Sequence, residues 1–317
     1  MEHLCRKQKL AGRASLAIFT ILIGIFTALS GCQGFHIFNQ GSDTTATTTP
    51  VQKLTSTKSV MLTPSSSLGI GSTQTMSKDG MVMVYVPAGE FSMGSADSDS
   101  QAQSNEKPQH KVYLDAFWID RSEVTNWMYA LCVQVGACRE PLLTRSFYRH
   151  TYYDDEQFKD YPVIFVGWDD AKTYCKWAGR RLPTEAEWEK AARGTDGRSY
   201  PWGESIDCTK ANYQDGKEGC VGDTAQVGSY PKGASPYGAL DMAGNVWEWV
   251  EDYYGESYYE NSPERNPTGP EEGDAHVLRG GSWNYFMAYS RCAFRFQNTA
   301  NYRFADVGFR CALSAAQ

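Results

Sequence analysis

The hydrophobic positions between residues 81 and 120 have the spacing of short strands joined by turns. Residues 81–86, MVMVYV, form an apolar run that ends at Pro87-Ala88-Gly89, which predicts a strand followed by a turn. Residues 90–94 are expected to begin a second strand, and residues 111–120, KVYLDAFWID, to form a third. The polar residues 96–108 are expected to form a loop between them.

Three later segments have helical spacing instead. The first is expected to start at Ser122 and to bury one face, made of Val124, Trp127, Met128, Leu131 and Val135. In the second, Asp169 is the expected cap and Gly179 the stop, with four residues pointing inward: Ala171, Tyr174, Cys175 and Ala178. The third has the sharpest boundaries, because Thr184 and Glu187 have the spacing of a capping box and Gly194 follows Arg193.

After residue 194 the periodicity fades. Gly, Pro, Asn and Asp recur every few residues with aromatic residues between them, and only short strands, such as 277–279 and 309–312, are expected. The pattern predicts one mixed α+β domain over residues 76–317, with three helices, short strands and much ordered loop. No internal repeat is visible.

The first 75 residues have a different character. Residues 16–29 are an apolar run of 14 residues after a basic start, which is typical of a signal peptide over residues 1–31. The run ends in Leu29-Ser30-Gly31-Cys32, which resembles the lipobox of bacterial lipoproteins, so Cys32 is the expected lipidation site. The alternative is an uncleaved anchor with an incidental cysteine. Either interpretation predicts an extracytoplasmic, membrane-anchored protein.

Residues 32–75 are predicted to be a flexible linker. Of the 43 residues from Gln33 to Thr75, 17 are Ser or Thr, so the segment cannot bury enough apolar area to offset its ordering entropy. The whole chain has a net charge of −7, and outside the signal peptide there is no basic run. Nucleic acid is therefore not an expected partner.

The cysteines fit an oxidising compartment. Apart from Cys5 and Cys32 there are seven, an odd number. Two pairs each bracket a short loop that contains glycine, and local disulfides are expected there: Cys132 with Cys138, and Cys208 with Cys220. Zinc is the other interpretation of clustered cysteines, but no CxxC spacing supports it.

A series of motifs in a fixed order spans residues 80–312. They are PAGEFSMGS at 87–95, IDRSEVTN at 119–126, RLPTEAEWEKAARG at 181–194, YPWG at 200–203, ANY at 211–213, YGALDMAGNVWEW at 237–249, LRGGSW at 278–283, RCAFR at 291–295 and GFRC at 308–311. The ordered set resembles the formylglycine-generating enzyme, or sulfatase-modifying factor, family. The resemblance implies a loop-rich variant of the C-type-lectin-like fold and, as activity, the oxidation of a substrate cysteine on a protein or peptide.

The resemblance also implies calcium sites. One would use Asp241, the carbonyl oxygens of Gly244 and Val246, and Glu248, which together form the oxygen-rich cage that calcium prefers. The alternative is a solvated acidic turn. A second would use Asn212 and the carbonyl of Tyr213, with either Asp215 or Asp223 as the acid.

Cysteine roles follow from the same resemblance. Cys175 and Cys311 match a structural disulfide of the family. Cys292 matches another family cysteine whose usual partner falls at Ala192, so Cys292 is expected to be unpaired. It is either a residual metal or redox ligand or, as we favour, a small buried hydrophobic residue.

The segment between the RGGSW and RCAFR motifs departs from the enzymes of the family. They carry a redox pair of cysteines there, whereas residues 284–290 read NYFMAYS. Soft thiolates select Cu(I), and one cysteine cannot supply a two-thiolate site, so copper is not expected. Ser282 shapes the pocket, and neither Ser282 nor Cys292 is assigned a secure catalytic role.

Other chemistries have weaker support. Some family relatives are iron-dependent, and an iron site built from His110, His150 and His276 is an open but disfavoured alternative. There is no GxSxG motif and no evident base for Ser282, which argues against a hydrolase.

Two functions therefore remain. The first is an exported protein modifier of the oxidase type, with formylglycine formation itself in doubt. The second is a non-catalytic, calcium-stabilised module that binds a protein or glycan through an apolar patch of Tyr285, Phe286, Met287 and Tyr289.

Overall fold

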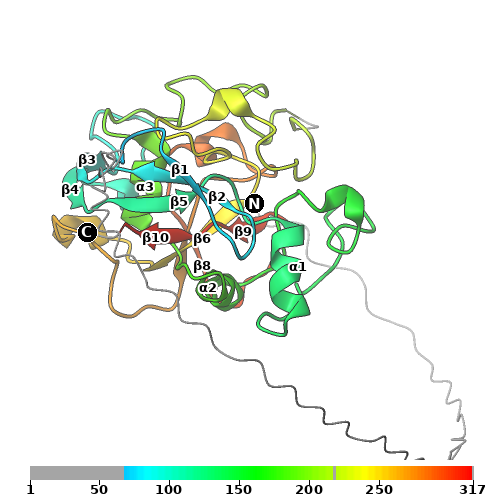
Figure 1. The fold of residues 1–317 in the computed structure, drawn as a ribbon. Helices are drawn as coiled ribbons and strands as arrows, with labels where there is room; N and C mark the ends of the chain where they lie inside the picture. Colours follow the sequence, from blue (N-terminus) through cyan, green and yellow to red (C-terminus); the bar gives the residue numbers. More distant parts are fainter. Residues whose placement is uncertain (1–67, 217–218, 316–317) are drawn as a thin grey trace, which may run out of the picture. The chain divides into compact units, whose positions relative to one another are not determined.

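The computed structural model describes residues 68–216 and 219–315 (Figure 1). The predicted signal peptide, the lipidation site Cys32 and most of the predicted linker lie outside the described residues. Within the described part, no helix is both long enough and apolar enough to cross a membrane.

Three antiparallel or mixed sheets form the framework. The first has the order β1-β2-β5-β10 and is antiparallel throughout, with the strands Thr73–Thr75, Val82–Val86, Phe117–Asp120 and Ala312–Ser314. The second pairs β3 (Gly89–Met93) with β4 (His110–Leu114). The third has the order β8-β7-β6-β9, with the strands Phe296–Asn298, His276–Arg279, Trp247–Tyr253 and Val307–Phe309, and β6 and β9 are parallel.

Three α-helices pack around these sheets: α1 (Asn126–Gln134), α2 (Trp168–Trp177) and α3 (Glu185–Arg193). In Figure 1, α1 and α2 lie at one end of the domain and α3 lies beside β3 and β4. Short 3₁₀ turns occupy Ser104–Glu106, Glu156–Phe158, Pro231–Gly233, Tyr258–Asn261 and Met287–Ser290, the last labelled η5. The α+β class with three helices and short strands is as predicted.

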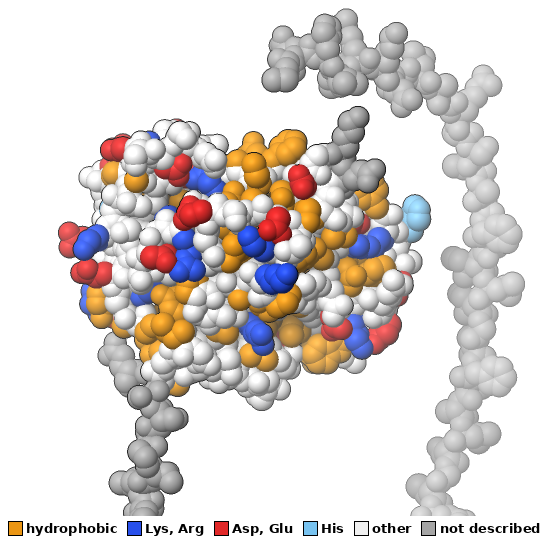
Figure 2. All heavy atoms as spheres, turned by 90° about the horizontal axis from the view of Figure 1, so that it is seen from above, with side chains coloured by type: hydrophobic (Ala, Val, Ile, Leu, Met, Phe, Trp, Pro, Cys, Tyr) orange, Lys and Arg blue, Asp and Glu red, His pale blue; other side chains and the backbone are white. Residues whose placement is uncertain are grey.

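Loops and short helical turns, drawn from green through yellow to orange, make up the upper side of Figure 1. Figure 2 shows this side from above, where hydrophobic side chains gather in patches between charged ones. Beneath the surface, the core is rich in tryptophan, since Trp188, Trp247 and Trp249 are fully buried.

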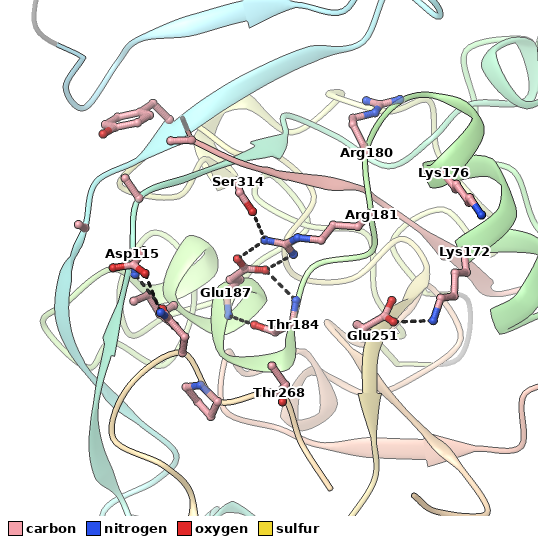
Figure 3. A pocket seen from close by; sticks show the side chains of 17 residues that line it. Asp115, Lys172, Lys176, Arg180, Arg181, Thr184, Glu187, Glu251, Thr268 and Ser314 are labelled. Atoms are coloured by element: carbon pink, nitrogen blue, oxygen red, sulfur yellow. Dashed lines mark hydrogen bonds and ion pairs between the residues drawn. The ribbon is translucent and has the colours of Figure 1, made fainter. Parts of the chain in front are cut away.

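The capping box predicted for α3 is present (Figure 3). Thr184 Oγ1 accepts the Glu187 N–H at 3.1 Å, and the Glu187 carboxylate accepts the Thr184 N–H at 2.8 Å. Gly194, with φ 71°, ends the helix as expected. A second partner holds the same carboxylate, because both its oxygens accept from Arg181 at 2.6 Å.

The prediction for α1 was wrong in its start and its buried face. The helix is capped by Thr125, and Trp127 and Val135 are 46% and 66% exposed. Tyr129 and Cys132 are buried instead. The stacking of Tyr129 on Tyr174 and the disulfide of Cys132 turn this other face inward.

The strand predictions need correction at four places. The run 111–120 is divided between β4 and β5, because the chain leaves one sheet at Asp115 and enters another. Residues 309–312 are likewise divided, with β9 ending at Phe309 and β10 starting at Ala312. The seven residues of β6 were not predicted as a strand, and Thr73–Thr75, placed in the linker, forms β1.

Candidate functional site

The GGSW turn follows directly on β7 and is built by close backbone approach. Gly280 and Gly281 have φ of 95° and 74°, values that favour glycine. A Cβ on Gly281 would lie 2.6 Å from Ser290 Oγ. The turn therefore presses residues 282–285 against η5, and this fixes the position of the segment that holds Ser282.

Ser282 is fully buried and bonded to an acid that the sequence did not indicate. Its hydroxyl donates to Asp306 Oδ2 at 2.9 Å, and its oxygen accepts the Asn284 N–H at 3.3 Å. Burial raises the pKa of Asp306 to about 6, and Asp306 Oδ1 has no hydrogen-bond partner among the described residues. Ser282 thus has a carboxyl partner rather than a histidine base.

Cys292 is a buried, unreactive thiol. It lies in the same core cluster as Ala191 and Ala192, and it is free and fully buried. Burial raises the pKa of its thiol to about 12, so the thiol stays protonated near neutral pH. Its position is set by the backbone, because its N–H donates to the carbonyl of Ser199 at 2.8 Å.

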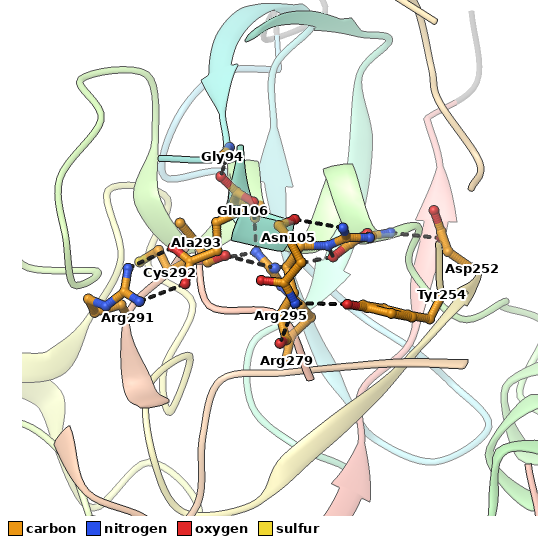
Figure 4. A network of polar contacts seen from close by, with 12 residues as sticks. Gly94, Asn105, Glu106, Asp252, Tyr254, Arg279, Arg291, Cys292, Ala293 and Arg295 are labelled. Carbon is orange, nitrogen blue, oxygen red and sulfur yellow. Dashed lines mark hydrogen bonds and ion pairs between the residues drawn. The ribbon is translucent and has the colours of Figure 1, made fainter. Parts of the chain in front are cut away.

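A buried ionic network fixes the chain on both sides of Cys292 (Figure 4). Arg279 donates to the carbonyl of Cys292 and pairs with Glu189 at 2.7 Å. Arg291 pairs with Glu106, also at 2.7 Å. Arg295 continues the network through Glu185 on α3. Since each arginine is matched by a buried carboxylate, the network is structural and leaves Cys292 little freedom to move.

No second thiol accompanies Cys292 within residues 68–216 and 219–315. All three expected disulfides are present: Cys132–Cys138, Cys175–Cys311 and Cys208–Cys220. Cys292 is the one cysteine of the described residues outside a disulfide.

The segment that replaces the cysteine pair exposes apolar side chains. Phe286 and Met287 are 60% and 51% exposed. Phe147 and Tyr148, at 47% and 67%, pack against Trp283, with ring centroids 5.8 and 6.2 Å away. Tyr285 and Tyr289 of the same segment are half-buried. We call Tyr285, Phe286, Met287 and Tyr289 the aromatic surface. The sequence suggested these four residues but not Phe147 and Tyr148, which reach Trp283 only through folding.

At the first predicted calcium position, the structure offers a different pair of acids. Both oxygens of Glu248 accept from Arg310, at 2.6 and 2.7 Å, and Trp188 donates to the same carboxylate at 2.8 Å. Asp241 instead faces Glu123, whose Oε2 has no hydrogen-bond partner among the described residues.

Two buried acids face each other at this position, and the charge of Arg310 acts on both. Burial, and then the nearby Asp241, raise the pKa of Glu123 well above its usual range. Burial likewise raises the pKa of Asp241. An orphaned carboxylate oxygen beside a second acid suits a hard cation, so Asp241 and Glu123 fit calcium, whereas Glu248 is already neutralised. The sequence could have suggested Glu123 as a ligand, because this residue lies in the motif IDRSEVTN.

Near the second predicted position, the structure brings Asn212 and Asp223 together. Asn212 Nδ2 donates to the Asp223 carbonyl at 2.8 Å, and Asn212 Oδ1 has no partner among the described residues. Asp223 is buried, whereas Asp215 is exposed. The Tyr213 carbonyl accepts the Cys220 N–H at 3.0 Å. Of the two candidate acids, Asp223 is the one beside Asn212, although its carboxylate already accepts from Ser146 at 2.6 Å.

The three histidines do not form a cluster. His276 begins β7 and is buried between Trp168 and Tyr253, with ring centroids 3.7 and 4.3 Å away. His110 packs on Tyr259, and His150 is exposed. In the described part of the chain, no group of three or more His, Cys, Asp or Glu side chains is placed to hold a metal ion.

Comparison with known proteins identifies the family. Residues 71–315 match the sulfatase-modifying factor enzyme 1-like domain. The chain therefore belongs to the formylglycine-generating enzyme, or sulfatase-modifying factor, family. The family and the fold class predicted from the sequence are both confirmed.

Individual relatives differ in length and in name. The chain is 37% identical over 243 residues to the serine/threonine-protein kinase pkn1 of Chlamydia caviae, with 73% of this chain and 37% of the kinase covered. It thus spans little more than a third of that relative. It is 35% identical over 282 residues to the formylglycine-generating enzyme of Streptomyces coelicolor, with 73% and 89% covered.

Among solved structures, PvdO from Pseudomonas aeruginosa is similar, with a TM-score of 0.66 and 28% identity. The match covers 78% of this chain and 99% of PvdO. The likeness therefore extends over a whole PvdO-sized domain.

Proposed function

We propose that this chain is a non-catalytic member of its family that binds a polypeptide through the aromatic surface. The observation that carries the proposal is the state of Cys292, a solitary, buried thiol whose pKa burial raises to about 12. A Cu(I) site of the family type needs two accessible thiolates, and the described residues supply none.

The aromatic surface supports binding in place of catalysis. Exposed aromatic and methionine side chains anchor protein–protein contacts, because they bury much apolar area for little lost conformational entropy. Phe286 is also held in place, since its backbone bridges to Gln214. We favour a polypeptide over a glycan because the family acts on protein substrates.

Calcium and a lipid anchor complete the proposal. Asp241 and Glu123, with the carbonyl oxygens of Gly244 and Val246, would hold one ion and so brace the WEW turn. Cys32 would tether the domain to the outer side of a bacterial membrane through the linker. The ion would keep the domain rigid, and the lipid and linker would hold it at some distance from the membrane.

Catalysis and binding are tested separately. In the first experiment, the full-length protein, loaded with copper, is incubated with a cysteine-containing peptide while oxygen uptake and peptide mass are recorded. We expect neither oxygen uptake nor conversion of cysteine to formylglycine. Turnover would contradict the proposal.

In the second experiment, random peptides displayed on phage are selected on the wild-type protein. The selected peptides are expected to contain apolar residues and to lose binding to the variant Phe286→Ser/Met287→Ser. Val135→Ser is the matched control, because Val135 is equally exposed but lies on α1. Peptides that bind the double variant as tightly as the wild type would refute this surface, and glycan-array binding without peptide binding would refute the choice of ligand.

A further inference from the structure

A large cavity lies away from the aromatic surface and shares no residue with it. Its volume is about 910 Å³, within the range of small-molecule binding pockets. Figure 3 shows its walls, which come from β2, the β4–β5 turn, α2, the chain before α3, β6 and the C-terminal strand β10. Residues far apart in the sequence thus converge on one concave site.

Much of the wall is apolar. The apolar lining residues come from four regions of the chain and are Tyr85, Ala88, Leu114, Ala116, Pro267 and Ala315. Tyr85 is held edge-on against Trp118, with ring centroids 5.1 Å apart. The wall is therefore preformed. A ligand can bury its apolar body there without the cost in conformational entropy of ordering the wall.

The acidic side chains of the lining already have cationic partners. Glu187 is bound by Arg181 through both oxygens, and Glu251 accepts from Lys172 at 2.6 Å. Asp115 is paired with Arg265 and accepts from Asn266 at 2.7 Å. The carboxylates are thus engaged by the protein itself and leave little capacity to bind a cation.

The polar groups of the lining that remain available to a ligand are hydrogen-bond donors. Arg180 is buried and paired with Asp79 and Asp120, but Lys176 has no carboxylate partner within residues 68–216 and 219–315. Ser314 Oγ accepts from Arg181 at 3.2 Å. Thr184 Oγ1 accepts from the Glu187 N–H at 3.1 Å. Their hydroxyl hydrogens have no acceptor among the described residues, so each can donate to a ligand.

We propose that this cavity binds a small organic carboxylate with an apolar or aromatic body. The carboxylate pairs with Lys176, and the body packs along the apolar wall that includes Leu114 and Ala116. One unpaired ammonium matches one negative charge, which favours a monocarboxylate over a nucleotide or a phosphate dianion. This site is independent of the polypeptide surface proposed above.

The test compares two probes of one shape, 4-phenylbutyrate and its neutral amide, by isothermal titration calorimetry on the full-length protein in lipid nanodiscs. The wild type is expected to bind the carboxylate about tenfold more tightly than the amide, as one charge-assisted hydrogen bond requires. Lys176→Met should remove this preference while the amide affinity stays the same. Ala116→Trp, which fills the cavity, should abolish the binding of both probes.

Lys232→Met is the matched control, because Lys232 is an exposed lysine outside the cavity, and it should leave both affinities unchanged. A thermal midpoint within a few degrees of wild type shows that Ala116→Trp is folded; Leu114→Phe is the second filling variant if it is not. Equal binding of acid and amide, no binding of either at millimolar concentration, or the same loss in Lys232→Met would overturn the proposal.

Discussion

Asp306 is a buried acid, and only one of its two carboxylate oxygens has a hydrogen-bond partner among the described residues. Oδ2 accepts from Ser282, and Oδ1 has no partner among the described residues. Burial raises its pKa from 3.8 to about 6. Between these values, the unfolded chain releases a proton that the folded chain retains, so the contribution of Asp306 to stability falls as pH rises and stays low above pH 6.

Asp306→Asn is expected to stabilise the protein at neutral pH. The amide oxygen can still accept from Ser282, and no charge is buried. The free energy of unfolding should rise by about 2 kcal/mol at pH 7.5 and change little at pH 3.5. Urea unfolding at both pH values measures the difference. Asp274→Asn, at an exposed position, is the control and should show no such pH dependence.

Glu123 and Asp241 give the second prediction at this scale. If they hold calcium, chelation with EGTA should lower the thermal midpoint by roughly 5–10 °C, as expected for an ion present at about 100 times its dissociation constant. Glu123→Gln should abolish this response. In EGTA, the same variant should be more stable than the wild type, because burial raises the pKa of Glu123, so the folded wild type must take up a proton there and the amide need not.

Asp274→Asn is the comparison variant for calcium, since Asp274 is an exposed acid outside both proposed calcium positions. It should keep the full calcium response. A wild-type midpoint that does not move on chelation would remove the calcium site from the proposal.

The helices show what local sequence can predict. The start and end of α3 were predictable because the Thr184–Glu187 box and Gly194 are local signals that tertiary contacts reinforce. The buried face of α1 was not, because it depends on Tyr174 of α2 and on the Cys132–Cys138 disulfide. Strand β6 escaped prediction because both of its faces are buried: Trp247 and Trp249 lie on one face, and Glu248 and Val250 on the other, so burial does not alternate along it.

The candidate site likewise contains residues that the sequence could locate and residues that only the fold revealed. Motif order located Ser282, Cys292 and Asp241, and cysteine spacing suggested two of the three disulfides. The sequence could not predict that Asp306 and Phe147 contact the GGSW segment, because each is more than twenty residues away from it along the chain. Glu248 was assigned as a ligand from its motif, and only the fold showed its pairing with Arg310.

The disulfides that connect elements should differ strongly in their effect on stability. Cys175–Cys311 joins α2 to the end of the chain across 136 residues, whereas Cys132–Cys138 spans 6. Loop-closure entropy predicts a loss of about 5 kcal/mol for the variant Cys175→Ala/Cys311→Ala and about 2 kcal/mol for Cys132→Ala/Cys138→Ala. Chemical denaturation of the two double variants measures both. Equal losses would show that chain entropy does not govern the effect.

At the scale of the whole molecule, the proposed anchor makes a simple prediction. Cys32→Ala should move the protein from the membrane fraction to the soluble fraction, because one residue carries the lipid. Fractionation and radiolabelled palmitate incorporation measure this. Cys5→Ala is the control and should leave the protein membrane-bound and labelled. A Cys32→Ala protein that stays in the membrane would favour the uncleaved anchor instead.

The last residues of the chain complete two sheets at once. Strand β9 lies beside β6, β10 pairs with β5, and Cys311 between them is bonded to α2. Both sheets therefore depend on residues 307–314, and displacement of this one segment would leave β6 and β5 each short of one neighbour.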